Sequence, residues 1–312
     1  MHFRSLCFSG GGITGVAHLG FLKALEDERL LGGIDTVVGT SVGAIVGTLY
    51  ALGFDSSAMY SALLSMNRQK LFNAVTLNNI STDAADSETF VDQLVDVFDI
   101  LFTEFGLDDG RYLMAYLVDM LLNRGLDPRI TFEQLHSKFK KRLIITATNL
   151  SAHRPEYFSL DTHPNMRVLD AVRVSVSIPF LFTSIEMDNQ RFVDGSVCDN
   201  YSIEHCIQDF TNRYPLSVGL FGVIGCCLNG MPPRNTNDFG GFVFNLLAST
   251  IKKGGFRGYT VNVDLNELSS IDFNASPVQL DGAFDAGREA CALYLRSLRG
   301  KSSLLISRRR SV

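Results

Sequence analysis

The sequence predicts an α/β fold with a mainly parallel central sheet, and three observations support that prediction. Two strand–loop–helix units open the chain, Phe3–Leu31 and Thr36–Leu52. Further strand patterns then alternate with helical ones up to residue 299. With 312 residues and 46% apolar composition, the chain has enough apolar surface for a full core. No repeat or linker divides it, so we expect one domain over 1–300 and a basic tail over 301–312.

The first unit begins with an apolar strand, Phe3–Phe8. A glycine-rich loop follows, and from Val16 to Leu31 the leucines recur at helical spacing. The loop contains Gly10, Gly11, Gly12 and Gly15. Glycines leave backbone N–H groups unobstructed, which is what a developing oxyanion requires nearby.

The second unit places a short strand, Thr36–Val38, before Gly39-Thr40-Ser41-Val42-Gly43. This is the G-x-S-x-G form of a nucleophile elbow, in which a tight strand-to-helix turn exposes the serine hydroxyl. The uncharged run Thr36–Phe54 also has the glycine spacing of packed membrane helices. Because the elbow falls where strand should become helix, we expect a buried strand and a core helix, with no transmembrane helix.

Residues 55–142 are predicted to form a helical insertion. Apolar residues recur at three- and four-residue steps from Phe90 to Leu101, and Arg111–Arg124 continues the pattern. Thr131 and Gln134 have the spacing of a capping box that opens a further helix. Such an insertion either walls a site or serves only as helical packing, and both interpretations stay open.

Four further strands are expected after the insertion. They are Leu143–Thr148, Phe192–Val193, Val218–Ile224 and Thr260–Val263, and a last helix is expected over Gly282–Arg299. Asp194-Gly195 directly follows the second of these strands, so its carboxylate is expected at a strand end.

Composition excludes several classes of function. The net charge of −5 gives no signature of nucleic-acid binding, and Arg308–Arg310 is only a short cationic run. The six cysteines lack C-x-x-C spacing, which argues against a disulfide framework and against a zinc site. No metal or cofactor is expected, since a serine hydrolase mechanism requires none. Met1–Ser5 enters a strand too early for a signal peptide. We therefore expect a cytoplasmic protein.

The glycine loop permits two nucleotide interpretations besides an oxyanion hole. Gly10-x-Gly12-x-x-Gly15 matches the dinucleotide fingerprint, but that fingerprint needs an acidic residue at the end of the next strand, whereas Asp35 precedes it. A P-loop needs G-K-[ST], and Thr14 stands before Gly15. The oxyanion interpretation is favoured, since adjacent parallel strands would bring the loop and Ser41 to the same sheet edge.

Ser41 needs a base to accept its proton. Asp194 is the better candidate, because desolvation and a short bond to the serine would let a carboxylate act as base. A Ser41–Asp194–His205 order is formally possible, but the α/β-hydrolase fold has several strands before its elbow, and this chain has one. The six histidines are scattered and lie in no recognisable motif: His2, His18, His136, His153, His163 and His205.

These motifs together resemble those of the patatin-like phospholipase family. The resemblance covers most of the chain and lies in Ser9–Gly20, Gly39–Gly43, Ser175–Pro179, Asp194–Gly195 and Asp199–Asn200. It implies a three-layer α/β/α fold, a Ser41–Asp194 dyad, and oxyanion donors among the backbone amides of Gly10, Gly11 and Gly12. Gly15, Gly39, Gly43 and Gly195 are the supporting motif glycines. The family usually has Arg or Lys in place of Thr14, and Gly or Ala in place of Ser196.

The resemblance also implies an acyl hydrolase of the phospholipase A or lysophospholipase type, acting on phospholipid or another acyl-ester lipid through an acyl-enzyme. The alternatives are a non-catalytic lipid-binding or interaction protein on the same fold and, third, a dinucleotide-binding protein. Phe239–Leu247, followed by Lys252, Lys253 and Arg257, suits either an interfacial helix in transient contact with a membrane surface or a core helix with a basic end.

Overall fold

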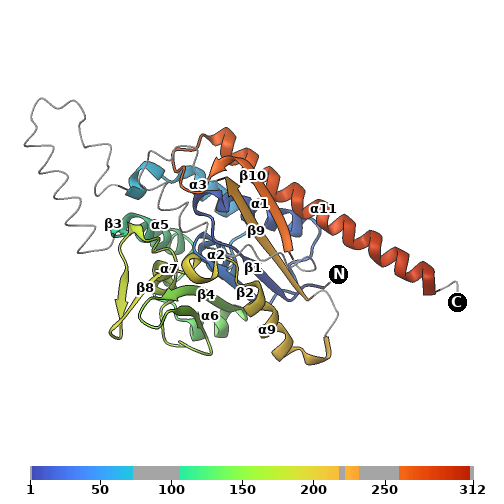
Figure 1. The fold of residues 1–312 in the computed structure, drawn as a ribbon, viewed down its shortest axis with the longest axis horizontal. Coiled ribbons are helices and arrows are strands. Elements are labelled where there is room, and N and C mark those ends of the chain that lie inside the picture. The colour runs from blue at the N-terminus through green and yellow to red at the C-terminus, as the bar shows by residue number, and fades with distance from the viewer. Residues whose placement is uncertain (1, 73–105, 218–221, 232–259, 310–312) are drawn as a thin grey trace, which may run out of the picture.

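A mainly parallel sheet organises the structure, a computed structural model that describes residues 2–72, 106–217, 222–231 and 260–309 (Figure 1). Its strands are ordered β10-β9-β1-β2-β4-β8-β7. The first five in this order run parallel to their neighbours. They are β10 (Thr260–Ser269), β9 (Val223–Met231), β1 (Ser5–Phe8), β2 (Thr36–Thr40) and β4 (Arg142–Asn149).

Antiparallel strands complete one side of this sheet. Both β8 (Gln190–Asp194) and β5 (Arg154–Ser159) pair with β4, and β7 (Ile185–Met187) pairs with β8. The β7–β8 turn has two central residues, Asp188 and Asn189, with φ of 51° and 58°, as tight hairpin turns require. A separate two-stranded sheet joins β3 (Gly106–Asp108) to β6 (Phe180–Phe182).

Helices cover both faces of the sheet because its buried strands alternate their side chains between two apolar clusters. Leu6, Phe8 and Val37 belong to the main core, whereas Cys7 and Val38 pack on the opposite face with residues of α9. The helices are α1 (Val16–Asp27), α2 (Val42–Ala51), α3 (Ser56–Ser65), α5 (Arg111–Leu122), α6 (Phe132–Phe139), α7 (Val168–Ser175), α8 (Ser196–Asp199), α9 (Ile203–Arg213) and α11 (Pro277–Arg309). The predicted α/β/α arrangement is confirmed.

Short 3-10 turns are also present, η1 (Gly12–Gly15), η2 (Arg68–Phe72) and η4 (Pro215–Ser217). The last helix is longer than expected: α11 packs along α1 and then continues past it (Figure 1). The capping box is confirmed, since Gln134 N donates to Thr131 Oγ1 and Thr131 N donates to Gln134 Oε1.

The expected insertion over 55–142 is only partly within the described residues. Helices α3, α5 and α6 lie in it, and so does the strand β3, which the sequence did not predict. The Phe90–Leu101 series, the strand start at 218–221 and the stretch 239–257 lie outside the described residues. Every helix that the structure describes is too short or too polar to cross a membrane.

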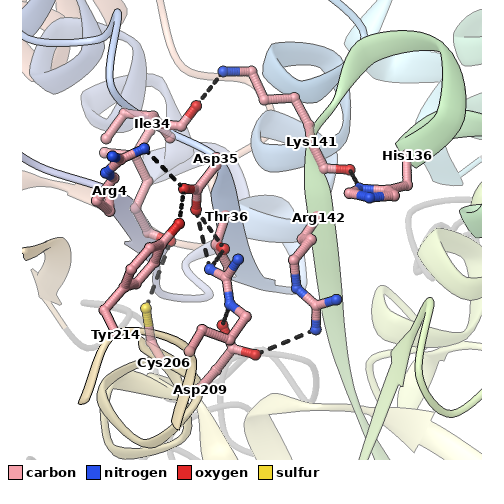
Figure 2. Close-up of polar contacts among 12 residues, drawn as sticks. Arg4, Ile34, Asp35, Thr36, His136, Lys141, Arg142, Cys206, Asp209 and Tyr214 are labelled. Atoms are coloured by element: carbon pink, nitrogen blue, oxygen red, sulfur yellow. Dashed lines mark hydrogen bonds and ion pairs between the residues drawn. The ribbon is translucent and has the colours of Figure 1, made fainter. Parts of the chain in front are cut away.

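A network of ion pairs joins the amino ends of β1, β2 and β4 to α9 (Figure 2). Asp35 accepts from Arg4 at 3.4 Å and from Arg213 at 3.0 Å, and it also accepts from Tyr214. Arg142 pairs with Asp209 at 3.3 Å. Asp35 therefore lies at the amino ends of the strands, whereas the glycine loop lies at their carboxyl ends. From there Asp35 cannot bind a ribose held by that loop, so the dinucleotide interpretation is not favoured.

Candidate active site

Ser41 lies at a strained turn between β2 and α2. Its φ of 55° and ψ of −125° are rare for a residue with a side chain, and such strain persists only where the surroundings enforce it. A methyl group at Gly39 would stand 2.3 Å from Gly43 O, and one at Gly43 would stand 2.5 Å from Ser9 O. Both flanking glycines are therefore required by close backbone approach, and the predicted elbow is formed.

Ser175 stabilises this turn from another element. The Ser41 amide donates to Ser175 Oγ at 2.9 Å, and Ser175 Oγ donates to Thr146 O at 2.6 Å. Ser175 ends α7 and is fully buried. The sequence alone assigns Ser175 no role of its own, because 134 residues separate it from Ser41 and no local pattern links the two.

The glycine loop lies against Ser41 because β1 and β2 are adjacent and parallel, with Phe8 paired to Gly39. A methyl group at Gly10 would stand 3.3 Å from Ser41 Cβ and 2.3 Å from Asn200 Oδ1. The Gly10 amide already donates to Asn200 O at 2.9 Å. Among the described residues, the amides of Gly11 and Gly12 have no hydrogen-bond partner.

Thr14 holds the glycine loop from within. Its hydroxyl donates to Gly11 O at 2.6 Å, and its side chain is fully buried. A charged residue at this buried position would need a partner of its own, whereas threonine satisfies its hydroxyl locally. Gly15 packs closely against α2, since a methyl group there would stand 2.3 Å from Val42 Cγ2. The loop therefore contacts the first turn of α2.

Asp194 ends β8 beside β4 and is fully buried. Its amide donates to Ser177 O at 2.9 Å, and a methyl group at Gly195 would stand 2.4 Å from Thr146 O. One carboxylate oxygen, Oδ1, accepts from the amide of Ser196 at 2.8 Å and from its hydroxyl at 2.6 Å. The other oxygen, Oδ2, is buried and has no hydrogen-bond partner among the described residues.

Burial raises the pKa of Asp194 to about 6, although hydrogen bonds from Ser196 and the side chain of Ser41 act to lower it. The Ser41 hydroxyl therefore lies near the carboxylate, yet it makes no contact with Oδ2 that meets hydrogen-bond geometry. Catalytic hydrogen bonds are often loose without substrate and tighten when it binds. A carboxyl group with a pKa near 6 is a much better base at neutral pH than an ordinary aspartate.

Among the described residues, no histidine is hydrogen-bonded to Ser41 or Asp194. His18 is fully buried, its Nε2 contacts Ser9 O at 2.8 Å, and burial lowers its pKa to about 4. His205 stacks on Tyr157 with ring centroids 3.7 Å apart. Nor do the described residues bring three or more potential metal ligands together. The six cysteines are free thiols.

Ser41 lines an apolar cavity together with residues of the first helices. The cavity encloses about 930 Å³ including its open mouth. The lining includes Val16 of α1, Val46 and Leu49 of α2, Met59 and Ala62 of α3, and Leu117 of α5. Within the described residues, the cavity wall has no charged side chain. This space suits a long apolar group attached to the atom that Ser41 attacks.

Comparisons with known proteins identify relatives of this chain. The family model for patatin-like phospholipases matches residues 6–207. A protein of Invertebrate iridescent virus 6 named "Probable lipid hydrolase" is 27% identical over 213 residues, which are 66% of this chain and 64% of that protein. A lysophospholipase of Aspergillus fumigatus is 27% identical over 200 residues, 64% of this chain but 11% of that protein. The chain thus matches less than two thirds of the length of these relatives.

Two solved structures share the fold. VipD from Legionella pneumophila has a TM-score of 0.52 at 16% identity, over 95% of this chain and 67% of that one. ExoU from the type III secretion system of Pseudomonas aeruginosa has a TM-score of 0.50 at 17% identity, over 95% of this chain and 52% of that one. At these identities the likeness concerns the fold alone.

Proposed function

The chain belongs to the patatin-like phospholipase family, and from this premise we propose that it is a serine hydrolase of fatty-acyl esters, of the phospholipase A or lysophospholipase type. One observation carries the proposal. Ser41 stands on a strained elbow, beside a buried carboxylate with a raised pKa, and it lines an apolar cavity. The names of the viral and fungal relatives support a lipid substrate.

The proposed reaction begins when Ser41 Oγ attacks the ester carbonyl and Asp194 Oδ2 accepts its proton. The tetrahedral oxyanion is bound by the amides of Gly11 and Gly12, at the amino end of η1, which have no partner within the described part of the chain. The Gly10 amide, also a candidate from the sequence, is occupied by Asn200 O. It therefore contributes only if that bond breaks.

Collapse of the intermediate breaks the ester bond, and Asp194 returns its proton to the leaving alcohol. Water then attacks the acyl-enzyme while Asp194 accepts a proton from it. When this second intermediate collapses, Asp194 passes that proton to Ser41 Oγ, and the fatty acid is released. Both halves of the reaction use the same base and the same oxyanion site. These residues therefore account for the proton transfers in both half-reactions.

The cavity indicates which part of the substrate enters the protein. Its apolar lining would desolvate an acyl chain favourably, at about 25 cal/mol per Å² of apolar surface removed from water. A headgroup would remain outside, since no charged side chain lines the part of the cavity that the structure describes. We expect transient contact with a lipid surface, because the proposed substrate resides there.

The test is turnover of defined phospholipids, lysophospholipids and soluble acyl esters by the wild type and by Ser41→Ala and Asp194→Asn. We expect each variant to lose activity by at least about 10³-fold, as removal of a nucleophile or its base does. A fluorophosphonate probe is expected to label the wild type at Ser41. Ser61→Ala, at an exposed serine of α3, serves as the control and should keep full activity.

Wild-type turnover by Ser41→Ala would disprove the mechanism. Liposome binding without turnover or probe labelling would instead support the non-catalytic alternative. Both outcomes can be read from the same protein preparations.

A further inference from the structure

Ser196 is bound to the proposed catalytic carboxylate through both its main chain and its side chain. Its amide and its hydroxyl each donate to Asp194 Oδ1, at 2.8 and 2.6 Å. The hydroxyl bond is short, as expected for a hydroxyl that donates to a carboxylate. Glycine or alanine at this position would keep the amide bond and lose the hydroxyl bond, so the second contact depends on serine.

Both hydrogen bonds fall on the same carboxylate oxygen. Oδ2 is left buried and unpartnered among the described residues, although a buried carboxylate oxygen normally has a partner. The torsion that turns a carboxylate is broad and nearly two-fold, so a single bond to Oδ1 would restrain it poorly. Two donors at different positions on Oδ1 restrict that rotation and keep Oδ2 directed away from Ser196.

We propose that Ser196 is a positioning residue that fixes the Asp194 carboxylate through Oδ1 and keeps Oδ2 available to the Ser41 hydroxyl. This inference rests on the proposed function, because it assigns Oδ2 the role of base. Ser196 itself contacts neither the substrate nor the attacking atom.

Ser196 also stabilises the charged form of Asp194. Burial alone would raise its pKa further, and the hydrogen bonds from Ser196 and from the side chain of Ser41 hold it at about 6. The charged groups on neighbouring elements have partners of their own. On α7, Arg173 donates to Ser177 and Thr183, and Asp170 pairs with Arg167. Asp199 of α8 accepts from Tyr157, and Glu186 of β7 pairs with Arg191. β4 has no titratable side chain from Leu143 to Asn149, and α2 has only Tyr50. None of these groups shifts the pKa of Asp194.

The experiment compares Ser196→Ala, Ser196→Thr and the wild type in the pH dependence of kcat/KM for a soluble acyl ester. In Ser196→Ala we expect the acid limb to move up by about one pH unit, since a hydrogen bond to a charged group is lost. Activity at pH 6 should then fall about fivefold, and activity at pH 9 should fall less. Ser196→Thr keeps the hydroxyl and should restore the wild-type profile.

Ser184→Ala is the matched control. Ser184 accepts a hydrogen bond from Arg191 and makes no contact with Asp194, so its removal should leave the acid limb in place. An unshifted limb in Ser196→Ala, or equal shifts in the alanine and threonine variants, would overturn the proposal.

A second measurement does not depend on activity. The carboxyl carbon of Asp194, in protein labelled with ¹³C-aspartate and assigned by comparison with Asp194→Asn, is titrated by NMR. We expect a higher pKa in Ser196→Ala than in the wild type, and an unchanged pKa would contradict the proposal. If the wild type hydrolyses no ester, the proposed function fails, and the NMR titration still decides the role of Ser196 toward the carboxylate.

Discussion

At the scale of single residues, the site is assembled from groups that would be unfavourable elsewhere. Ser41 has a positive φ although it carries a side chain, and Asp194 is a fully buried carboxylate with one oxygen that has no partner among the residues described. Each costs folding free energy unless its surroundings enforce it. Such costs are typical of functional sites, where stability is given up for reactivity.

Asp194→Asn is therefore expected to stabilise the protein at neutral pH while it removes activity. The folded pKa of about 6 lies above the ordinary value of 3.8, so the folded state binds its proton more tightly. The resulting penalty develops between pH 4 and pH 6 and is complete above pH 6, where it amounts to about 3 kcal/mol at most. An asparagine avoids the charge and keeps an oxygen for Ser196.

The measurement is thermal unfolding at pH 5 and at pH 7.5. The gain in Tm of Asp194→Asn over the wild type should be larger at pH 7.5. An equal or smaller gain at pH 7.5 would show that the aspartate carries no burial penalty.

At the scale of elements, α1, α2, α3 and α5 form the apolar cavity next to Ser41. The helices pack against one another around it and leave space that a well-packed core would fill. Because α2 begins at the nucleophile, its Val46 and Leu49 line the cavity one and two turns further on. The helix that sets the elbow therefore also shapes the proposed acyl site.

Ala62→Phe is expected to shorten the acyl chain that the protein accepts. Ala62 lies on α3 and lines the cavity, so a phenyl ring there would occupy space that a long chain needs. We expect kcat/KM for a C16 ester to fall about tenfold or more relative to a C4 ester, as several buried CH₂ groups are worth about 0.8 kcal/mol each. Activity on the C4 ester should remain.

The control is Ser61→Phe, the adjacent and exposed position of α3. It adds the same ring outside the cavity and should leave the C16 to C4 ratio unchanged. A ratio that is also unchanged in Ala62→Phe would show that the acyl chain binds elsewhere.

At the scale of the whole molecule, the two ends of the parallel strands serve different purposes. The carboxyl ends of β1 and β2 lead into the glycine loop and Ser41, whereas their amino ends are joined by the ion pairs around Asp35. Burial opposes the charge of Asp35, but hydrogen bonds from Tyr214 and Arg213 outweigh it and lower its pKa. The network therefore stabilises the fold above the ordinary aspartate pKa and weakens in acid.

Arg213→Ala is expected to reduce stability and to leave catalysis intact. Arg213 bonds Asp35, Thr36 and Asp209, with about a quarter of its side chain exposed, so we expect a loss of about 1–2 kcal/mol and a Tm lower by a few degrees. The kcat for a soluble ester at 25 °C should match the wild type. Arg129→Ala, at a pair that is 79% and 57% exposed, should change neither quantity.

A substantial loss of kcat in Arg213→Ala at 25 °C would show that the candidate site at the carboxyl ends of the strands depends on the ion pairs at their amino ends. An unchanged Tm would show that the network is no more than a set of solvated surface pairs.

The sequence by itself determined the α/β class, the two opening units, the elbow at Ser41 and the capping box at Thr131, because each depends on neighbours along the chain. It also proposed Asp194, through the order of its motifs. Only the tertiary structure decided which groups meet: Ser175 on the Ser41 amide, Asn200 on Gly10, Ser196 with two bonds to Oδ1, and four helices around one cavity. Such contacts join residues far apart in sequence, or depend on rotamers and burial, so no local pattern encodes them.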